Sequence, residues 1–455
     1  MAEVKRRTDD PRSEAVRLHA RHRGTVQMMP KCPIRGFGDF AIWYTPGVAA
    51  SCLAIASDPD RVFEQTNRGN TVAIVSDGSR VLGLGNIGPA AGLPVMEGKA
   101  LLFKYLGGVD AVPLCLSVAD ADTLIEVVRA LEPSFGGINL EDIAQPKCFR
   151  ILDTLRDAMD IPVWHDDQQG TATALLAGLT NALEVVGKPV AGLKVAMIGM
   201  GAANVATYRL LTAWGLDPSG VIACDSTGIL HPGRSDIEAR CSEFVDKWRI
   251  CRESNAEGVV GGIAEAMRGA DVCIAFAAPG PEVIRPEWVQ SMAHDAVVFA
   301  CANPVPEIWP DEAKRAGARV VATGRSDFPN QVNNSLVFPG LFRGVLDVRA
   351  RCISNEMAIA AAETLARCGQ SRGLSPGAIV PRMDDPELAP KIAAAVAAVA
   401  VEQGLARNPI AAEQVERQAT ERIRRTRAAA EMITSDRVLS EPIGTDPDEP
   451  DGASS

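Results

Sequence analysis

Short apolar runs and longer amphipathic segments alternate along most of the chain. In its first part the apolar runs cover residues 71–75, 81–84, 111–116 and 137–139, and segments with helical periodicity cover 98–106 and 122–131. Short apolar runs bounded by turn residues are typical of buried strands, whereas long amphipathic segments are typical of helices. The alternation predicts a mostly parallel α/β domain that ends near residue 165.

The same alternation is clearer further along the chain. Strands are predicted at 193–198, 221–224, 271–276, 296–300 and 319–322. Crossover helices are predicted at 202–214, 237–248, 263–267, 286–292 and 311–316. This order predicts a Rossmann-like, doubly wound parallel sheet. From residue 355 the chain is rich in Ala and is predicted to form helices that pack back on the first domain.

These patterns divide the 455 residues into five parts. They are an N-terminal arm, a first α/β domain, a Rossmann-like domain, C-terminal helices and a tail, at residues 1–24, 25–165, 166–350, 351–435 and 436–455. The tail is acidic and rich in Pro, a composition that predicts disorder.

Composition restricts the compartment and the partners. The formal net charge of −11 argues against nucleic acid as the main partner. The charged N-terminus lacks the apolar core of a signal peptide, and the apolar run at 392–401 is shorter than the roughly 20 residues that cross a bilayer. Eleven Cys residues without a C-x-x-C motif indicate reduced thiols. We therefore expect a cytoplasmic protein that has no membrane partner.

A glycine turn follows the first strand of the Rossmann-like domain. In Gly199-x-Gly201-x-x-Asn204 the first Gly permits a tight turn, and the second lets a pyrophosphate approach the backbone at Ala202 and Ala203, where a helix begins. Asn204 departs from the usual third Gly or Ala, which casts doubt on cofactor affinity. A tight turn in a fold that binds no cofactor is the alternative interpretation.

The next strand ends at Asp225, which could accept a hydrogen bond from a ribose 2′-hydroxyl. No Lys or Arg follows it closely, and the first basic residue is Arg234, so a 2′-phosphate would meet a carboxylate without a nearby cation. The sequence thus favours NAD, with NADP possible. A second match, at residues 83–88, precedes Pro89; we expect that no helix begins there and that its glycines shape a loop around a substrate.

Two acidic pairs end apolar runs, Glu141-Asp142 and Asp166-Asp167. Hard oxygen ligands suit Mg²⁺ or Mn²⁺, although surface carboxylates and helix caps are the alternative. A predicted helix at 171–186 connects the second pair to the glycine turn. This layout indicates hydride chemistry beside a metal. Local sequence alone would assign Lys99 to a solvated surface and Tyr44 to a loop.

Six motifs between residues 25 and 365 together resemble the malic enzymes in their shorter bacterial form. They are YTPGVA at 44–49, SDGSRVLGLGNIGPAAGLPVMEGKALLFK at 76–104, FGGINLEDI at 135–143, HDDQQGTA at 165–172, CANPVPEI at 301–308 and TGRSDFPNQVNNSLVFPG at 323–340. The resemblance implies oxidative decarboxylation of L-malate to pyruvate and CO₂, with NAD or NADP and a divalent metal. It also implies a homodimer, and assigns substrate and metal to the first α/β domain.

The resemblance also implies roles for single residues. Lys99 would be the general base at the C2 hydroxyl, Tyr44 the acid that protonates C3, and Asp166 the carboxylate that orients the lysine. The implied metal ligands are Glu141, Asp142 and Asp167. Arg80, Asn303 and Asn334 would bind the substrate, and the two asparagines would also contact the nicotinamide. Because Asp166 would raise the pKa of the lysine, its help would have to be orientation.

Three departures from the family pattern keep alternatives open. Gln169 stands where His is expected, Trp43 replaces a small residue beside Tyr44, and Asn204 replaces the third Gly or Ala of the glycine turn. Trp43 and Gln169 suggest an oxidative decarboxylase for another 2-hydroxy dicarboxylic acid. A catalytically silent metabolite-binding homologue would be explained by a clash between Asn204 and the pyrophosphate.

Overall fold

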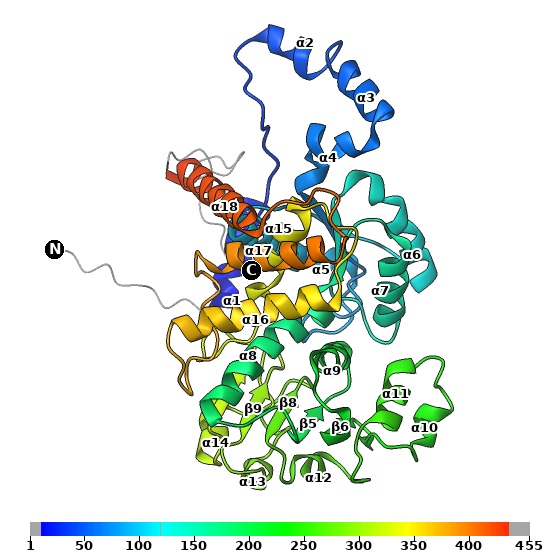
Figure 1. The fold of residues 1–455 in the computed structure, drawn as a ribbon, viewed down its shortest axis with the longest axis vertical. Helices are drawn as coiled ribbons and strands as arrows, with labels where there is room; N and C mark the ends of the chain where they lie inside the picture. The colour runs from blue at the N-terminus through cyan, green and yellow to red at the C-terminus, as the bar shows by residue number, and fades with distance from the viewer. Residues whose placement is uncertain (1–10, 119, 436–455) are drawn as a thin grey trace, which may run out of the picture.

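The computed structural model describes residues 11–118 and 120–435 (Figure 1). The predicted tail at 436–455 and the first ten residues of the predicted N-terminal arm lie outside the described residues. A four-stranded and a six-stranded sheet form the two halves of the molecule. Helix α8 (Thr171–Val186) leads from the first sheet to the second.

The first sheet has the order β2-β1-β3-β4 and is parallel throughout. Its strands are β1 (Thr71–Ser76), β2 (Asp110–Cys115), β3 (Gly137–Leu140) and β4 (Val163–His165). Val72 and Ile74 of β1 belong to the core shared with α5 (Gly88–Gly107). Ala73 and Val75 face the core under α6 (Ala121–Ala130) and α7 (Lys147–Ala158). Helices therefore cover both faces, which is why the strand is apolar at consecutive positions.

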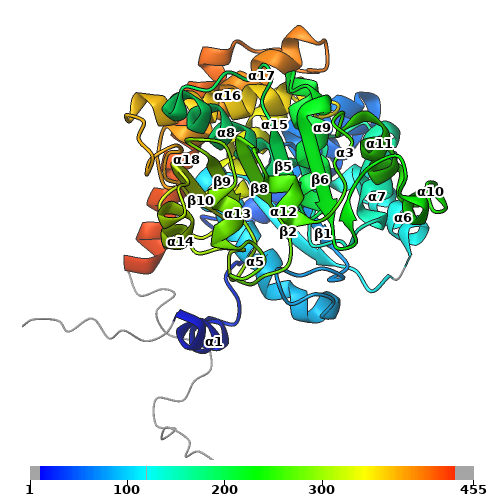
Figure 2. The same ribbon diagram turned by 90° about the horizontal axis from the view of Figure 1, so that it is seen from below.

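The second sheet has the order β10-β9-β8-β5-β6-β7. Its strands are β5 (Val195–Ile198), β6 (Val221–Asp225), β7 (Gly228–Ile229), β8 (Val272–Ala275), β9 (Val297–Ala300) and β10 (Val320–Thr323), and β7 alone among them runs antiparallel. Figure 2 shows α8 and α9 (Ala202–Trp214) on one side of these strands and α12 (Ile263–Met267) and α13 (Pro286–Gln290) on the other. The predicted Rossmann-like, doubly wound arrangement is thereby confirmed.

The C-terminal helices hold the two halves together. They are α15 (Phe338–Asp347), α16 (Asn355–Ser371), α17 (Leu388–Glu402) and α18 (Ala412–Ser435). Helix α16 packs against α8, whereas α15, α17 and α18 contact α5. Phe103 of α5 lies against the rings of Phe338 and Phe342, at 4.5 and 5.2 Å between centroids. Helices α17 and α18 therefore contact the first domain through α5.

The segment before β1 leaves this body. After α1 (Pro11–His22) come η1 (Phe37–Asp39), α2 (Phe40–Trp43) and α3 (Val48–Ser57), which stand away from both sheets at the top of Figure 1. We call residues 25–57 the exposed arm, because none of them is buried. The stretch Phe37–Ser57 is long and apolar enough to pass a test for a membrane span by length and composition. It is divided among three short helices, however, each well under the roughly 20 residues that a span requires.

Three local predictions are wrong. Residues 81–84 form a turn with an isolated bridge from Val81 to Gly85, not a strand. Helix α5 begins at Gly88, ten residues before its predicted start, because Pro89 sits in the first turn, where its missing N–H needs no partner. The predicted helix at 237–248 is instead divided between α10 (Ser235–Glu238) and α11 (Val245–Glu253). Helix α7 was not predicted, although its buried face repeats at helical spacing.

Candidate active site

A cavity of about 1010 Å³ opens between the carboxyl ends of the two sheets. It is lined by the loop after β1, by α5, by the turn after β3, by the start of α9 and by loops that follow β8, β9 and β10. Ligands of open parallel sheets bind at this edge. Most of the predicted site residues line it: Arg80, Lys99, Glu141, Asp142, Asp167, Gly201, Ala202, Ala203, Asn303 and Asn334. Gly83 and Gly85 also line it, as expected for glycines that shape a substrate loop.

Lys99 lies on α5 with 8% of its surface exposed. Its Nζ donates to Asp166 Oδ2, lies 3.0 Å from Glu141 Oε1, and sits 4.3 Å from the centre of the Phe338 ring. Burial lowers the pKa of Lys99, but Asp166 and Glu141 outweigh burial and raise that pKa above its ordinary value. The lysine is therefore not the solvated residue that local sequence suggests.

Asp166 has the geometry of an orienting group. Its Oδ1 accepts a hydrogen bond from Trp164 Nε1 at 3.0 Å, while its Oδ2 accepts from Lys99, and the side chain is completely buried. A side chain at Gly170 would overlap Asp166, so the glycine keeps this place open. Asp166 and Asp167 lie in the first turn of η5 (Asp166–Gly170), a π-helical turn, and contact different partners, Lys99 and the backbone N–H of Asp142.

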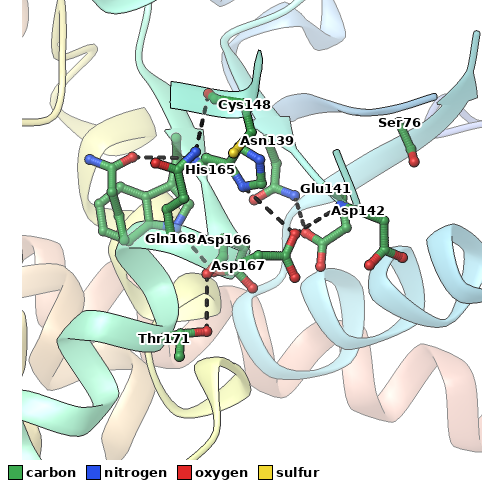
Figure 3. A network of polar contacts seen from close by, with 12 residues as sticks. Ser76, Asn139, Glu141, Asp142, Cys148, His165, Asp166, Asp167, Gln168 and Thr171 are labelled. Atoms are coloured by element: carbon green, nitrogen blue, oxygen red, sulfur yellow. Dashed lines mark hydrogen bonds and ion pairs between the residues drawn. The ribbon is translucent and has the colours of Figure 1, made fainter. Parts of the chain in front are cut away.

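Register brings the acidic pairs together. Leu140 at the end of β3 is aligned with His165 at the end of β4, so the residues after each strand lie side by side (Figure 3). Asp167 Oδ2 accepts the backbone N–H of Asp142 at 2.8 Å. Burial, followed by the charge of Asp167, raises the pKa of Asp142 to about 8. Burial also raises the pKa of Glu141 well above its ordinary value, and Asp167 adds to this effect.

This cluster has the chemistry of a divalent cation site. Its donors are hard carboxylate oxygens, and Oδ2 of Asp142 is buried without a hydrogen-bond partner. The raised pKa values of Glu141 and Asp142 show that their charged forms are disfavoured, and a bound cation would stabilise those forms. Glu141, Asp142 and Asp167 therefore fit Mg²⁺ or Mn²⁺. As they lie in the described residues, however, these side chains are not arranged as a group of three that could hold a metal ion.

Two buried residues beside the cluster, Asn139 and His165, were not predicted from the sequence. Asn139 Nδ2 donates to Glu141 Oε2 at 2.8 Å, and Nδ1 of His165 lies 3.6 Å from Asp167 Oδ2. Burial lowers the pKa of His165 to about 4, so the ring is neutral at neutral pH. The signal was present in the sequence, since each polar residue lies inside an apolar run directly before an acidic pair. Asn139 thus holds Glu141 by a hydrogen bond, whereas the His165 ring lies beside Asp167 without a hydrogen bond to it.

The predicted substrate residues lie on three different loops. Arg80 is exposed at the cavity, with its backbone N–H donating to the carbonyl of Asp142 at 3.0 Å. Asn303 follows β9, and Asn334 begins η7 (Asn334–Leu336). The loop of Asn303 lies against Gly83, where an added Cβ would lie 2.4 Å from the Asn303 carbonyl oxygen. The two halves of the molecule thus meet at the cavity through a glycine.

Tyr44 is not brought to the cavity. It lies in the exposed arm, its side chain is 71% exposed, and it is absent from the cavity lining. Trp43, predicted to reshape the substrate site, is 50% exposed in the same arm. Gln169 also does not line the cavity; its Oε1 accepts the backbone N–H of His165 at 3.0 Å. Asn204 is absent from the cavity lining as well, so all three sequence departures lie outside the cavity of this chain.

The glycine turn has the predicted form. Gly199 has φ +84°, and a Cβ there would lie 2.6 Å from the carbonyl oxygen of Phe276. Asn204 turns inward, fully buried, and its Nδ2 donates to the carbonyls of Ile198 and Gly199 at 3.0 and 2.8 Å. It ties the turn to β5 and does not project toward a pyrophosphate, so the expected clash does not occur. Ala202 and Ala203 begin α9 beside the cavity.

The environment of Asp225 differs from the prediction. Arg234 donates to both its carboxylate oxygens, at 3.1 and 3.2 Å, and Lys247 Nζ donates to Oδ2 at 3.2 Å. The premise that no cation lies near Asp225 is therefore wrong. The error arose because the two cations are close in space but lie 9 and 22 positions further along the chain. Burial raises the pKa of Asp225, but Arg234, Thr227 and Lys247 together outweigh burial, so the net shift of this pKa is downward.

Fold and site together define a dinucleotide-binding oxidoreductase whose nucleotide turn opens onto a lysine held among carboxylates. The sequence matches the malic enzyme N-terminal domain over residues 24–156 and the malic enzyme NAD binding domain over residues 168–401. The chain belongs to the malic enzyme family. The family, the fold class and the class of enzyme predicted from the sequence are thereby confirmed.

Relatives share most of the chain. The bifunctional malic/malolactic enzyme of Bacillus subtilis (strain 168) is 46% identical over 408 residues, which cover 89% of this chain and 96% of that protein. The NADP-dependent malic enzyme of Escherichia coli (strain K12) is 43% identical over 85% of this chain, but over 52% of its own length. The crystal structure of Entamoeba histolytica malic enzyme matches with a TM-score of 0.92 at 47% identity, covering 95% of this chain and 90% of that one.

Proposed function

We propose that this enzyme converts L-malate to pyruvate and CO₂ while reducing NAD or NADP, with Mg²⁺ or Mn²⁺ bound. The observation that carries the proposal is the place of Lys99, buried between Asp166 and Glu141 in the cavity that also contains the nucleotide turn. The first domain (25–165) supplies the base and the metal ligands, and the Rossmann-like domain (166–350) supplies the nucleotide site.

In this mechanism Lys99 takes the proton of the C2 hydroxyl as hydride leaves C2 for the nicotinamide. The bond from C3 to the departing carboxylate then breaks, CO₂ leaves, and its electron pair forms the enolate of pyruvate. An acid returns a proton to C3, and the resemblance assigns this role to Tyr44. Asp166 accepts a hydrogen bond from Lys99 and so would orient its amino group, the role that the resemblance implies.

Lys99 must be neutral before it can accept a proton, but the carboxylates of Asp166 and Glu141 favour its charged form. Glu141, Asp142 and Asp167 are the groups that would hold the divalent cation. A bound cation would supply Lewis-acid stabilisation of the enolate. Glu141 engaged as a ligand would no longer favour the charged form of Lys99, so its pKa would fall towards the working range. Arg80, Asn303 and Asn334 would orient the substrate carboxylates and the nicotinamide.

Nicotinamide reduction by purified protein tests the proposal. With L-malate and Mn²⁺ we expect metal-dependent reduction of NAD or NADP with one pyruvate formed per turnover, and loss of activity in EDTA. Lys99→Met should lower kcat by about 10²–10⁴-fold. Lys104→Met, an exposed lysine on the same helix, is the matched control and should retain activity.

Two alternative functions make different predictions for the same assay. Turnover of tartrate or of a 3-substituted malate, in preference to malate, would assign the enzyme to another 2-hydroxy dicarboxylic acid. Binding of nucleotide and Mn²⁺ without turnover of any such acid would indicate a silent homologue. Either result would contradict the proposal.

We also propose that the enzyme is a homodimer and that the exposed arm completes the active site of the second copy. Support comes from the apolar side chains that the arm exposes: Met28 97%, Phe37 91%, Phe40 49%, Ile42 64%, Trp43 50%, Tyr44 71% and Leu53 72%. Exposed apolar side chains gathered on one segment are typical of an interaction site. The second copy is the favoured partner because the arm carries Tyr44, the acid that the cavity of its own chain lacks.

A cytoplasmic location is part of the same proposal. All eleven cysteines have free thiols, and a protein of the reducing cytoplasm would keep them so.

A further inference from the structure

The carboxylate of Asp225 is already saturated with hydrogen bonds. Oδ1 accepts from the backbone N–H of Thr227 at 3.0 Å and from Arg234 Nη1 at 3.1 Å. Oδ2 accepts from Arg234 Nη2 and from Lys247 Nζ, both at 3.2 Å. A carboxylate has about four lone-pair positions, and all four are used. Asp225 therefore has no acceptor left for a ribose hydroxyl, the role on which the expected preference for NAD depended.

The two cations around Asp225 have different capacities. Arg234 also donates from Nε and Nη2 to Asp236, both at 2.7 Å, and from Nη1 to the carbonyl of Gly228 at 3.2 Å, so its donors are committed. Lys247, on α11, has three ammonium protons, and its described hydrogen bond to Asp225 uses one of them. The side chain is 15% exposed, so a ligand at the end of β6 can reach it.

The charges at this strand end balance, because Asp225 and Asp236 carry two negative charges and Arg234 and Lys247 carry two positive ones. Asp236 engages Arg234 through two hydrogen bonds of 2.7 Å, so Lys247 is the cation of this cluster that keeps donors for an anion. The exposed residues Ser226 and Thr227, which follow Asp225 directly, add hydroxyl donors at the same place.

We propose that Lys247 recognises the 2′-phosphate of NADP, and that Asp225, locked by Arg234, positions Lys247 for this contact instead of binding the ribose. The enzyme then uses NADP at least as well as NAD. The proposal rests on nucleotide binding at the second sheet, and it does not depend on the identity of the acid that is oxidised.

Binding of nucleotide fragments tests the proposal without any turnover. The probes are 2′,5′-ADP and ADP, which differ in the 2′-phosphate, titrated into the purified full-length enzyme by calorimetry. We expect 2′,5′-ADP to bind about tenfold more tightly than ADP, the effect of one charge-assisted hydrogen bond to phosphate. Added salt should reduce this difference.

Variants of Lys247 identify the contact. Lys247→Gln should weaken 2′,5′-ADP by about tenfold and reduce its preference over ADP, and Lys247→Arg should restore most of that preference. Lys194→Gln is the matched control, since Lys194 precedes β5 at the opposite end of the strands and pairs with Glu257. Thermal unfolding of each variant checks that it is folded.

Two results would overturn the inference: equal binding of the two fragments to the native enzyme, or an equal loss of both in Lys247→Gln. Malate turnover measured on the same preparations separates this inference from the proposed function. Turnover with NAD, without a preference for 2′,5′-ADP, would leave the function standing and refute the role of Lys247. A preference for 2′,5′-ADP without malate turnover would support the role of Lys247 and contradict the proposed function.

Discussion

Lys99 and Glu307 illustrate how burial changes the chemistry of single residues in this protein. Both are almost fully buried, at 8% and 0% exposure, and both are surrounded by groups that decide which form is stable. Two carboxylates keep Lys99 charged. Glu307 instead accepts the backbone N–H groups of Ala277 and Ala302, at 2.8 and 3.0 Å, and so ties together the loops that follow β8 and β9. Both loops line the cavity.

Glu307 should make stability depend on pH. Burial raises its pKa to about 7, above the ordinary value of 4.5, so the folded state binds the proton more tightly than the unfolded state. Its contribution to stability is therefore greatest below pH 4.5 and is lost as the pH rises towards 7, by up to about 3 kcal/mol. We predict that Glu307→Gln removes this slope. Denaturant unfolding between pH 5 and 8 measures it.

The native protein supplies the reference for Glu307→Gln, and Glu312→Gln on the nearby helix α14 (Pro310–Arg315) is a control at a non-buried position. Parallel curves for the native protein and Glu307→Gln across this pH range would contradict the prediction.

At the scale of elements, one connected unit carries both parts of the site. Strand β4 leads into η5, η5 into α8, and α8 by a short connection into β5 and the glycine turn. The turn is held on both sides: the Gly199 N–H donates to the carbonyl of Cys224 at 2.8 Å, and Asn204 holds the end of β5. Asn204 replaces a small residue but adds hydrogen bonds that a small residue could not make.

Asn204→Ala should therefore destabilise the Rossmann-like domain and should not improve cofactor binding. Loss of the bonds to Ile198 and Gly199 leaves buried carbonyls without this donor, which should cost about 1–3 kcal/mol. Thermal unfolding and ADP titration measure the two effects separately. A variant of unchanged stability that binds ADP more tightly would mean that Asn204 hinders the pyrophosphate after all.

At the scale of the whole molecule, the exposed arm is the part that a single copy of the chain leaves without a covering surface. Folding alone does not bury apolar side chains such as Phe37 and Met28. Assembly of two copies would bury them and would also bring Tyr44 to a cavity. Size-exclusion chromatography with light scattering measures the assembly state directly.

Mixing two inactive variants tests which chain supplies the acid. Tyr44→Phe and Lys99→Met should each be nearly inactive alone. If Tyr44 acts on the second copy, random mixed dimers will regain about a quarter of the native activity, because each heterodimer contains one site with both residues intact. If Tyr44 acts within its own chain, every site in the mixture lacks one of the two residues, and no activity will return.

Local patterns in the sequence were sufficient for the two parallel domains and for most of the site. Buried parallel strands are continuous apolar runs, and the residues directly after them lie at one edge of a sheet. The acidic pairs Glu141-Asp142 and Asp166-Asp167 were therefore candidates for a cation site, with surface carboxylates and helix caps as the alternative. The glycine turn was equally accessible, because its chemistry lies within six consecutive positions. The family motifs added roles that no local pattern contains, such as that of Lys99.

Contacts between distant residues were decided only by the tertiary structure. Asp225 meets Lys247, 22 positions away, through the packing of α11 on β6, and the side chain of Asn204 turns into the sheet instead of toward the ligand. Tyr44 lies in a motif typical of the active site but outside the cavity of its own chain. Sequence determined which chemical groups this protein has and which strand ends carry them. Packing decided which of those groups are paired, which keep free donors, and which lie away from the cavity of their own chain, because these depend on distances that the order of residues does not contain.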